Sequence, residues 1–268
     1  MIRRFWVFIE QVECTAHPVS WELIGVARRL ADQVRDEATS AGDTVVVEAV
    51  VVGKDVKAVA EEGLQYGADH VYVVEGEVFA HYRNQAYARA LVMVVQKYKP
   101  EVFFIGATTL GRDLAGAVAT SLGTGLTADC TRLEMGEVKE GAGKLLLATR
   151  PAFGGNVIAT IVCRTHRPQM SSVRPRVFPM PEKVSKVKGD ISYEKIPIKE
   201  EEIGAKIVRL IQNEAGSAKI EYADVLVAGG RALGGPEGFN LLKDLADVLG
   251  GEVAATRPCV DAGWISVD

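Results

Sequence analysis

The 268-residue sequence lacks several features that would assign it to a class of protein at once. Its four cysteines, Cys14, Cys130, Cys163 and Cys259, include no Cys-x-x-Cys pair, which argues against a zinc or iron–sulfur site and favours buried free thiols. No apolar run reaches the roughly 18 residues that a membrane-spanning helix needs, and no signal-peptide core follows Met1. We therefore expect a cytoplasmic protein without direct membrane insertion.

The sequence also lacks an excess of positive charge. Its 31 Lys and Arg residues are outnumbered by 35 Asp and Glu residues, the formal net charge is -4, and the basic residues are scattered among acidic ones. A nucleic-acid backbone is bound by a concentrated positive surface. Nucleic acid is therefore not an expected partner.

Apolar runs and helical spacings alternate over the first 108 residues. Strands are expected at residues 5–10, 44–52, 70–74 and 102–107, and helices between them at 19–34, 56–66 and 82–98. Strands that are separated by helices need crossover connections, and these produce a parallel sheet with helices on both faces. We predict an α/β fold whose N-terminal domain is a three-layer parallel-sheet domain.

The rhythm changes after residue 125, where strand-like segments follow one another without helices between them. These segments are residues 144–150, 157–164 and 173–178. We expect them to extend or flank the sheet with antiparallel pairing.

A polar segment with several prolines runs from residue 179 to 199 and is typical of a linker. Glu200, Glu201 and Glu202 are then expected to begin a helix, because acidic residues stabilise a helix N-terminus. The apolar residues on one face of that helix would be Ile203, Ile207, Leu210 and Ile211. The predicted organisation is an N-terminal domain at 1–190, a linker and helix at 191–222, and the start of a second domain at 223–268.

The second domain begins as another α/β unit. A strand is expected at residues 224–228, a glycine-rich loop at 229–235, a helix at 239–249 and a strand at 252–255. Two strands and one helix bury too little apolar surface to be stable alone. We therefore expect this unit to need further chain or a partner.

One candidate site is the turn from Gly106 to Asp113, where a strand ends and a helix begins near Arg112. The carboxyl end of a parallel strand next to a helix N-terminus can bind phosphate through free N–H groups. The turn has no Lys and no G-x-x-x-x-G-K-[ST] run, so a packed turn at a subunit interface is the favoured alternative.

A second candidate site combines the glycine-rich loop with the strand that follows it. The loop lacks the G-x-G-x-x-G spacing, but it carries Arg231, while Thr256 and Arg257 follow the next parallel strand at the same edge. Two guanidinium groups and a hydroxyl suit an anionic ligand, and no Ser-His-Asp pattern, paired acid or metal cluster accompanies them. A merely solvated Arg231 is the alternative.

Three segments resemble the alpha subunit of electron transfer flavoproteins. They are RPAFGGNVIATI at 150–161, RPQMSSVRPRVF at 167–178 and, most specifically, the run from the Gly-Gly-Arg loop to Asp-Ala-Gly at 229–263. The likeness covers essentially the whole chain. It implies an N-terminal domain of adenine nucleotide alpha hydrolase-like fold that holds no nucleotide and packs against a similar beta subunit, followed by an FAD-binding domain.

The resemblance also implies roles for individual residues. Arg231 would contact FAD, Thr256 would hydrogen-bond it, and Arg257 would lie against the isoalloxazine, where a positive charge raises the reduction potential. The Gln-x-Gly-Gln-Thr-Gly and Gly-Ile-Ser-Gly-Ala-Ile-Gln-His segments of the family are absent from this sequence. The resemblance therefore implies a chain that is truncated within its FAD-binding domain.

The function implied by the resemblance is that of an FAD-dependent electron carrier rather than a classical enzyme. Its expected partners are the beta subunit, acyl-CoA or other dehydrogenases, and quinone- or ferredoxin-linked redox proteins. Whether the complex also bifurcates electrons and oxidises NADH stays open. Two alternatives are an assembly subunit that only holds the beta subunit, and an adenine-nucleotide-binding enzyme that uses the turn at 106–113.

Overall fold

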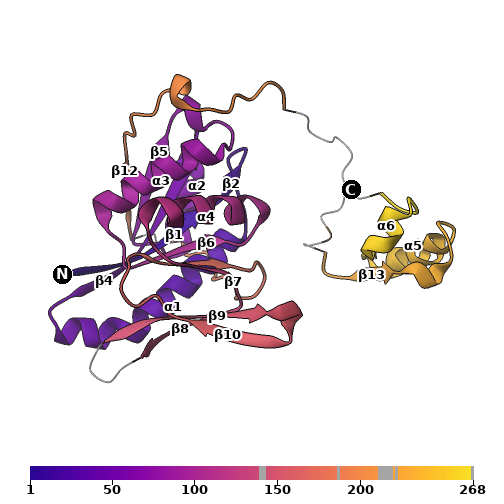
Figure 1. Ribbon diagram of the computed structural model, residues 1–268, viewed down its shortest axis with the longest axis horizontal. Helices are drawn as coiled ribbons and strands as arrows, with labels where there is room; N and C mark the ends of the chain where they lie inside the picture. The colour runs from indigo at the N-terminus through magenta and orange to yellow at the C-terminus, as the bar shows by residue number, and fades with distance from the viewer. Residues whose placement is uncertain (139–142, 186–187, 211–219, 221–222, 267–268) are drawn as a thin grey trace. The chain divides into compact units, whose positions relative to one another are not determined.

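The computed structural model describes residues 1–138, 143–185, 188–210, 220 and 223–266, and the chain forms two compact units, Met1–Lys206 and Ile207–Asp268 (Figure 1). The predicted domain boundaries at 190 and 222 differ from the division of the compact units at residue 206. They stay predictions, because a compact unit and an evolutionary domain can end at different residues. None of the helices in the described ranges is long and apolar enough to cross a membrane.

Unit 1 is built around a seven-stranded sheet in which every neighbouring pair of strands is parallel. In spatial order the strands are β12 (Asp190–Tyr193), β5 (His70–Glu75), β4 (Thr44–Gly53), β1 (Ile2–Ile9), β6 (Val102–Gly106), β11 (Gln169–Val173) and β7 (Leu126–Cys130). From β1 the chain first adds β4 and β5 on one side of β1 and then crosses to place β6 on the other side, so the strand order reverses between β1 and β6. The predicted α/β fold is confirmed.

Helices cover both faces of this sheet. The helices α1 (Val19–Ser40) and α2 (Lys57–Gln65) pack on one face, and α3 (Asn84–Tyr98) and α4 (Thr109–Leu122) pack on the other. Successive residues of β1 alternate between the two cores, since Phe5 belongs to the first and Trp6 to the second. Burial on both faces explains why the strands have continuous apolar sequences.

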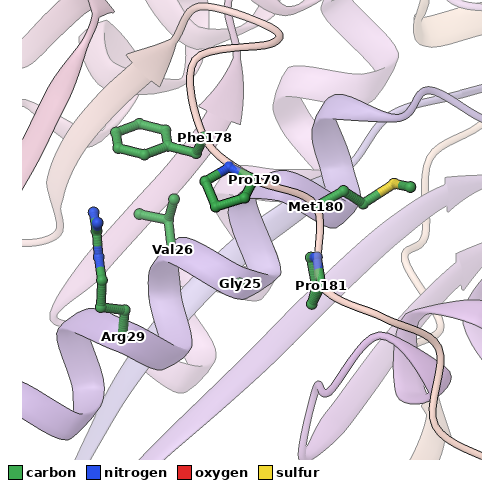
Figure 2. A pocket seen from close by; sticks show the side chains of 7 residues that line it. All are labelled: Gly25, Val26, Arg29, Phe178, Pro179, Met180 and Pro181. Atoms are coloured by element: carbon green, nitrogen blue, oxygen red, sulfur yellow. The ribbon is translucent and has the colours of Figure 1, made fainter.

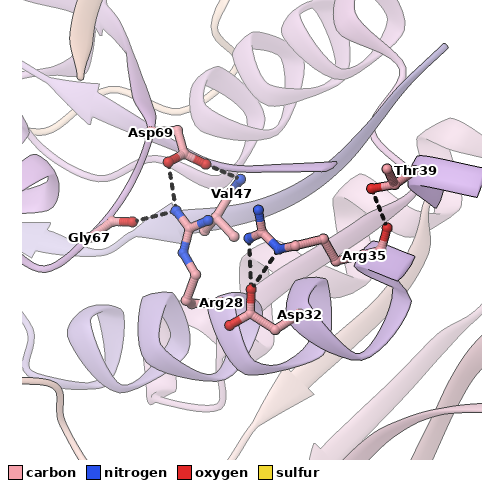
Figure 3. A network of polar contacts seen from close by, with 7 residues as sticks. All are labelled: Arg28, Asp32, Arg35, Thr39, Val47, Gly67 and Asp69. Atoms are coloured by element: carbon pink, nitrogen blue, oxygen red, sulfur yellow. Dashed lines mark hydrogen bonds and ion pairs between the residues drawn. The ribbon is translucent and has the colours of Figure 1, made fainter. Parts of the chain in front are cut away.

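Helix α1 is tied to the sheet by a polar network (Figure 3). The Arg28 Nη2 donates hydrogen bonds to Asp69 Oδ1 at 2.7 Å and to the Gly67 carbonyl oxygen at 2.9 Å. The other oxygen of Asp69 accepts from the Val47 N–H of β4 at 2.8 Å. One carboxylate thereby joins helix α1 and strand β4 to the start of β5.

A three-stranded antiparallel sheet lies on the α1 side of unit 1. Its order is β10 (Val157–Ile161), β9 (Lys144–Ala152) and β8 (Arg132–Glu137), and its buried residues join the core under α1. The antiparallel pairing expected for residues 144–150 and 157–164 is confirmed. The turn between β9 and β10 contains the 3-10 helix η2 (Phe153–Gly155).

The strand predicted at residues 173–178 is wrong, because β11 ends at Val173 and lies parallel between β6 and β7. A parallel strand needs a crossover connection. Between β7 and β11 this crossover is formed by the three-stranded sheet instead of a helix. The absence of a helical pattern after residue 125 therefore did not mean that the next strand is antiparallel. Beyond Val173 the chain carries Pro175 and Pro179, which have no N–H to donate to a ladder.

The helix predicted to begin at Glu200 is also wrong over the described residues, where only the 3-10 turn η3 (Glu200–Glu202) forms; Ile211 lies outside them. Two of these acidic side chains instead bind arginines at the start of helix α3 and within it. Glu200 accepts a hydrogen bond from Arg83 at 2.7 Å and Glu202 one from Arg89 at 2.7 Å. The segment expected as a linker also contributes strand β12, which pairs with β5.

Short elements complete unit 1: the strands β2 (Gln11–Val12) and β3 (Thr15–Ala16) and the 3-10 helix η1 (Glu77–Phe79). Unit 2 contains the strands β13 (Leu226–Gly229) and β14 (Glu252–Ala255), the 3-10 helix η5 (Arg231–Leu233), and the helices α5 (Gly238–Leu249) and α6 (Arg257–Asp261). The helix predicted at 239–249 and the strand predicted at 252–255 are confirmed.

Helix α5 leaves much of its apolar surface in solvent. Leu241 is 71% exposed, and Leu245 and Val248, four and seven residues further along the helix, are also exposed. This spacing places the three side chains on one face. Within its described residues, unit 2 buries little of its apolar surface, which agrees with the expectation that it needs further chain or a partner.

Candidate functional site

The residues predicted to bind an anionic ligand lie at the carboxyl edge of the two-stranded sheet in unit 2. Strands β13 and β14 are parallel, and Gly229 pairs with Ala255 at their last position. The Thr256 N–H donates a hydrogen bond to the Gly229 carbonyl oxygen at 2.9 Å. A Cβ placed on Gly230 would lie 3.6 Å from Thr256 Oγ1, so the two loops touch where they leave the sheet.

Glycine at position 229 allows the tight turn that carries Arg231. A Cβ on Gly229 would lie 2.5 Å from Leu233 Cδ1 and 2.5 Å from Leu242 Cδ1, so a larger residue would force these leucine side chains to move. Gly234 then has φ 79, a left-handed conformation that favours glycine. The sequence of the loop therefore favours a strand–turn–helix connection in which only Gly230 separates Arg231 from the strand.

The three side chains have few partners of their own. No ion pair or hydrogen bond joins the exposed Arg231 guanidinium to another described residue. Thr256 Oγ1 makes a weak contact of 3.7 Å with Cys259 Sγ. Arg257 is 84% exposed in its side chain, and its Nε donates to Asp261 Oδ1 at 2.7 Å. The Arg231 guanidinium, the terminal nitrogens of Arg257 and the Thr256 hydroxyl can thus still donate to a ligand at this edge.

This set of donors fits FAD. Guanidinium groups and a hydroxyl bind pyrophosphate oxygens and the carbonyl oxygens of a flavin ring. Gly230 lies beside Thr256 and has no side chain of its own, so a ligand can approach the backbone of the loop there.

The other candidate, the turn from Gly106 to Asp113 in unit 1, is a packed turn. The Thr108 hydroxyl accepts from the Gly111 N–H at 2.9 Å and donates to Glu10 Oε2 at 2.6 Å. Glu10 is only 4% exposed, and this burial raises its pKa.

The position of Glu10 decides between the two interpretations of this turn. It directly follows β1, next to the point where the strand order reverses, and ligands of open α/β sheets bind at such points. An ionised carboxylate at this position repels phosphate. This geometry argues against the adenine-nucleotide alternative. Sequence reasoning missed Glu10, although a single acid at the end of the apolar run FWVFI was a visible signal.

Replacing Glu10 with Gln is expected to stabilise unit 1 by about 1 kcal/mol at pH 7. Because burial raises the folded-state pKa, the unfolded chain loses this proton first, so stability falls as pH rises from the ordinary carboxyl range through the folded pKa. Gln keeps an acceptor for Thr108 and has no charge to desolvate. Urea unfolding at pH 7 and at about pH 4 measures the difference, which should vanish at the lower pH.

The control for this substitution is Glu75→Gln, which changes an exposed acid at the end of strand β5 in the same sheet. It should leave the free energy of unfolding nearly unchanged. A Glu10→Gln variant that is less stable than the wild type at pH 7 would show that the carboxylate stabilises the crevice.

A separate apolar pocket of about 250 Å³ lies between helix α1 and the segment after β11 (Figure 2). It is lined by Gly25, Val26, Arg29, Phe178, Pro179, Met180 and Pro181. The Arg29 guanidinium lies 5.3 Å from the centre of the Phe178 ring. Apart from that guanidinium the lining is apolar, so the pocket offers no set of groups for catalysis.

The described residues contain no group of three or more His, Cys, Asp or Glu side chains that could hold a metal ion. All four cysteines are free. Cys130 and Cys259 are buried as expected, whereas Cys14 is exposed and Cys163 is partly exposed. The expectation of four buried thiols is therefore wrong for Cys14, which lies in the turn between β2 and β3.

Comparison with known proteins matches both parts of the chain to one kind of protein. Residues 5–199 match the family described as "Electron transfer flavoprotein domain", and residues 219–268 match "Electron transfer flavoprotein FAD-binding domain". The second match covers the loops that carry Arg231, Thr256 and Arg257. It identifies FAD as the cofactor of this part of the chain.

Similar proteins carry two names. A "Protein FixB" of Azorhizobium caulinodans is 47% identical over 270 residues, which cover 99% of this chain and 69% of that protein. An "Electron transfer flavoprotein subunit alpha" of Megasphaera elsdenii is 45% identical, covering 97% of this chain and 74% of the relative. The protein of that name in Thermoanaerobacterium thermosaccharolyticum is 44% identical, covering 98% and 76%.

Alpha subunits of electron transfer flavoproteins pair with a beta subunit and pass electrons to partner proteins. The two matches cover nearly all of this chain, and the fold agrees with them. The chain therefore belongs to the electron transfer flavoprotein family, as an alpha subunit with an FAD-binding domain.

Proposed function

We propose that the carboxyl edge of β13 and β14 binds FAD through Arg231, Thr256 and Arg257. The observation that carries this proposal is the hydrogen bond from Thr256 N–H to the Gly229 carbonyl oxygen at 2.9 Å, which joins the two loops. Each arginine directly follows one of the two touching residues, Gly230 and Thr256. The match of residues 219–268 to an FAD-binding domain supports the choice of ligand.

The three side chains would have different roles. Arg231 and Thr256 would bind and orient the cofactor, because a guanidinium and a hydroxyl donate hydrogen bonds to its oxygens. Arg257 would supply positive charge beside the flavin ring. Asp261 accepts from Arg257 at 2.7 Å, which fixes the guanidinium and offsets part of its charge. When bound, FAD supplies the group that accepts and returns electrons.

We further propose that the electrons come from acyl-CoA or other dehydrogenases and go to a quinone- or ferredoxin-linked acceptor. The names of the relatives support the role of an electron carrier. Electron bifurcation would be an additional activity of the complex. The cytoplasm is the proposed location, because four free cysteines suit a reducing compartment. A subunit that only holds the beta subunit is the second candidate, and it would bind no flavin.

Arg231→Ala and Thr256→Val are each expected to weaken FAD binding about tenfold, since each removes one hydrogen-bond donor to the cofactor. The measurement is quenching of FAD fluorescence during titration with the cofactor-depleted subunit and its beta subunit. Lys243→Ala, which removes an exposed charge from α5, is the matched control and should not change the dissociation constant. Equal affinity in all variants would contradict the proposed site.

A further inference from the structure

A charged pocket of about 480 Å³ lies at the amino edge of the central sheet of unit 1, where its parallel strands begin. Small-molecule sites in proteins have volumes of this size. The pocket is lined by the starts of β1 and β9, by the end of α1, by residues that follow α1 and α3, and by the segments before β6 and β11. All of this lining belongs to unit 1, so the pocket is not part of the proposed flavin site. We call it the amino-edge pocket.

Backbone hydrogen bonds bring the segments of the amino-edge pocket together. Strands β1, β6 and β11 are neighbours in the sheet, and parallel strands begin at the same edge. The Glu101 N–H donates to the Arg4 carbonyl oxygen at 2.9 Å, and the Gln169 N–H donates to the Glu101 carbonyl oxygen at 2.8 Å. The Gln169 Oε1 accepts from the Leu146 N–H at 3.0 Å, which fixes the start of β9 beside the start of β11.

The acidic side chains that line the pocket are paired within the protein. Arg3 donates two hydrogen bonds of 2.7 Å to the carboxylate of Glu101, and its Nη1 lies 3.6 Å from Glu37 Oε1. The carboxylate of Asp43 accepts from the amino group of Met1 at 2.6 Å. Each of these carboxylates therefore already has a cationic partner.

The cationic side chains Lys99, Lys144 and Arg167 also line the pocket, and none of them forms an ion pair with a carboxylate of the part of the chain that the structure describes. Lys144 Nζ donates to the Gln33 carbonyl oxygen at 2.7 Å, and Arg167 Nη1 donates to the His166 carbonyl oxygen at 2.9 Å. A carbonyl oxygen accepts a hydrogen bond but does not neutralise the charge. Lys99 follows helix α3, whose C-terminal dipole it offsets in part.

These pairings leave the amino-edge pocket positively charged. Among the described residues of the lining, five positive groups face three carboxylates, which is a surplus of two positive charges. The lining also contains apolar side chains, since Ile2 is 51% exposed and Leu145 is partly exposed. Covering such side chains with an apolar group is favourable, because it removes apolar surface from water. The pocket therefore suits an anion that has an apolar part.

We propose that the amino-edge pocket binds a phosphate monoester that carries an apolar group. A phosphate monoester has about two negative charges at neutral pH, which matches the surplus of the pocket, whereas a monocarboxylate supplies one. Its oxygens would accept from the remaining nitrogens of Arg167 and from Lys144, because a guanidinium and an ammonium both donate strongly to phosphate. Its apolar group would lie against Ile2 and Leu145.

Phenyl phosphate is the probe, and we expect it to bind the complete alpha–beta complex with a dissociation constant of about 1 mM, as for a ligand of this size. Benzyl alcohol has the ring without the charge, and inorganic phosphate has the charge without the ring. Both should bind at least about tenfold more weakly, with benzoate between them and phenyl phosphate. Ligand-observed NMR titration measures these affinities, and added salt should weaken the binding of phenyl phosphate.

Arg167→Gln and Lys144→Gln are each expected to weaken the binding of phenyl phosphate about tenfold, since each removes a charged donor to the phosphate. Lys57→Gln is the matched control, because Lys57 is an exposed lysine that begins helix α2 after the carboxyl end of β4. It should change the affinity less than twofold. Thermal unfolding of all three variants should match that of the wild type.

Protection from acetylation locates the bound probe. Phenyl phosphate should slow the reaction of Lys144 with acetic anhydride and leave that of Lys57 unchanged, as measured by mass spectrometry. The proposal is overturned if the complex does not bind phenyl phosphate, or if the Arg167 and Lys144 variants bind it like the wild type. It is also overturned if the Lys57 variant loses as much affinity, or if benzyl alcohol or inorganic phosphate binds as tightly as phenyl phosphate.

Discussion

Gly111→Ala is expected to destabilise unit 1 by about 4 kcal/mol or more, which is at the upper end for a single substitution. The added Cβ would stand 1.9 Å from the Gly106 carbonyl oxygen, and that oxygen belongs to a central strand. Helix α4 could relieve this contact only by moving away from β6, because its start is fixed by the Thr108 cap. Urea unfolding followed by circular dichroism measures the loss.

Gly116→Ala is the matched control on the same helix. Nothing lies within 4 Å of a Cβ placed on Gly116, so the substitution adds only helix propensity. Alanine should stabilise the helix by up to about 1 kcal/mol. If both variants lose the same stability, the close approach of α4 and β6 is not what requires glycine at position 111.

Arg257→Ala is expected to lower the reduction potential of bound FAD by on the order of 50 mV, because it removes a positive charge from the proposed flavin site. The substitution also leaves Asp261 without its partner at 2.7 Å, so a negative charge becomes uncompensated. Both effects disfavour the addition of electrons. A spectroscopic redox titration of the complete alpha–beta complex measures the shift.

Two further variants separate charge from structure at this position. Arg257→Lys keeps the charge and should retain most of the potential. Asp261→Asn removes the partner that offsets the guanidinium, so it should raise the potential. If the Ala and Asn variants shift the potential in the same direction, or leave it unchanged, Arg257 does not tune the flavin by its charge.

The elements of the fold that follow from local sequence were predictable. The strands at 44–52 and 252–255 are continuous apolar or β-branched runs, and helix α5 stops at Gly250, which adopts φ 63 as a left-handed cap. The proposed cofactor residues were also found from the sequence. They follow two consecutive parallel strands, and the carboxyl ends of such strands lie at the same edge of a sheet. Each of these inferences used only neighbouring residues or adjacent elements.

Long-range pairing was not predictable in the same way. Strand β11 inserts between β6 and β7, and β12 pairs with β5 although the paired residues His70 and Asp190 are 120 positions apart in the chain. Glu200 forms an ion pair with Arg83 instead of beginning a helix. Such outcomes depend on which partners the folded core brings within reach, and local propensity carries no information about that.

The sequence by itself determined the alternation of strands and helices, the glycines at the tight turns, and the cationic residues at the edge of the second sheet, because these depend on local conformation. Only the tertiary structure decided that the Glu10 carboxylate accepts a hydrogen bond from Thr108, that β10 is the edge of its sheet, and that Arg112 and Arg174 both pair with Asp129. Those features join residues far apart in the chain, and packing alone brings them together.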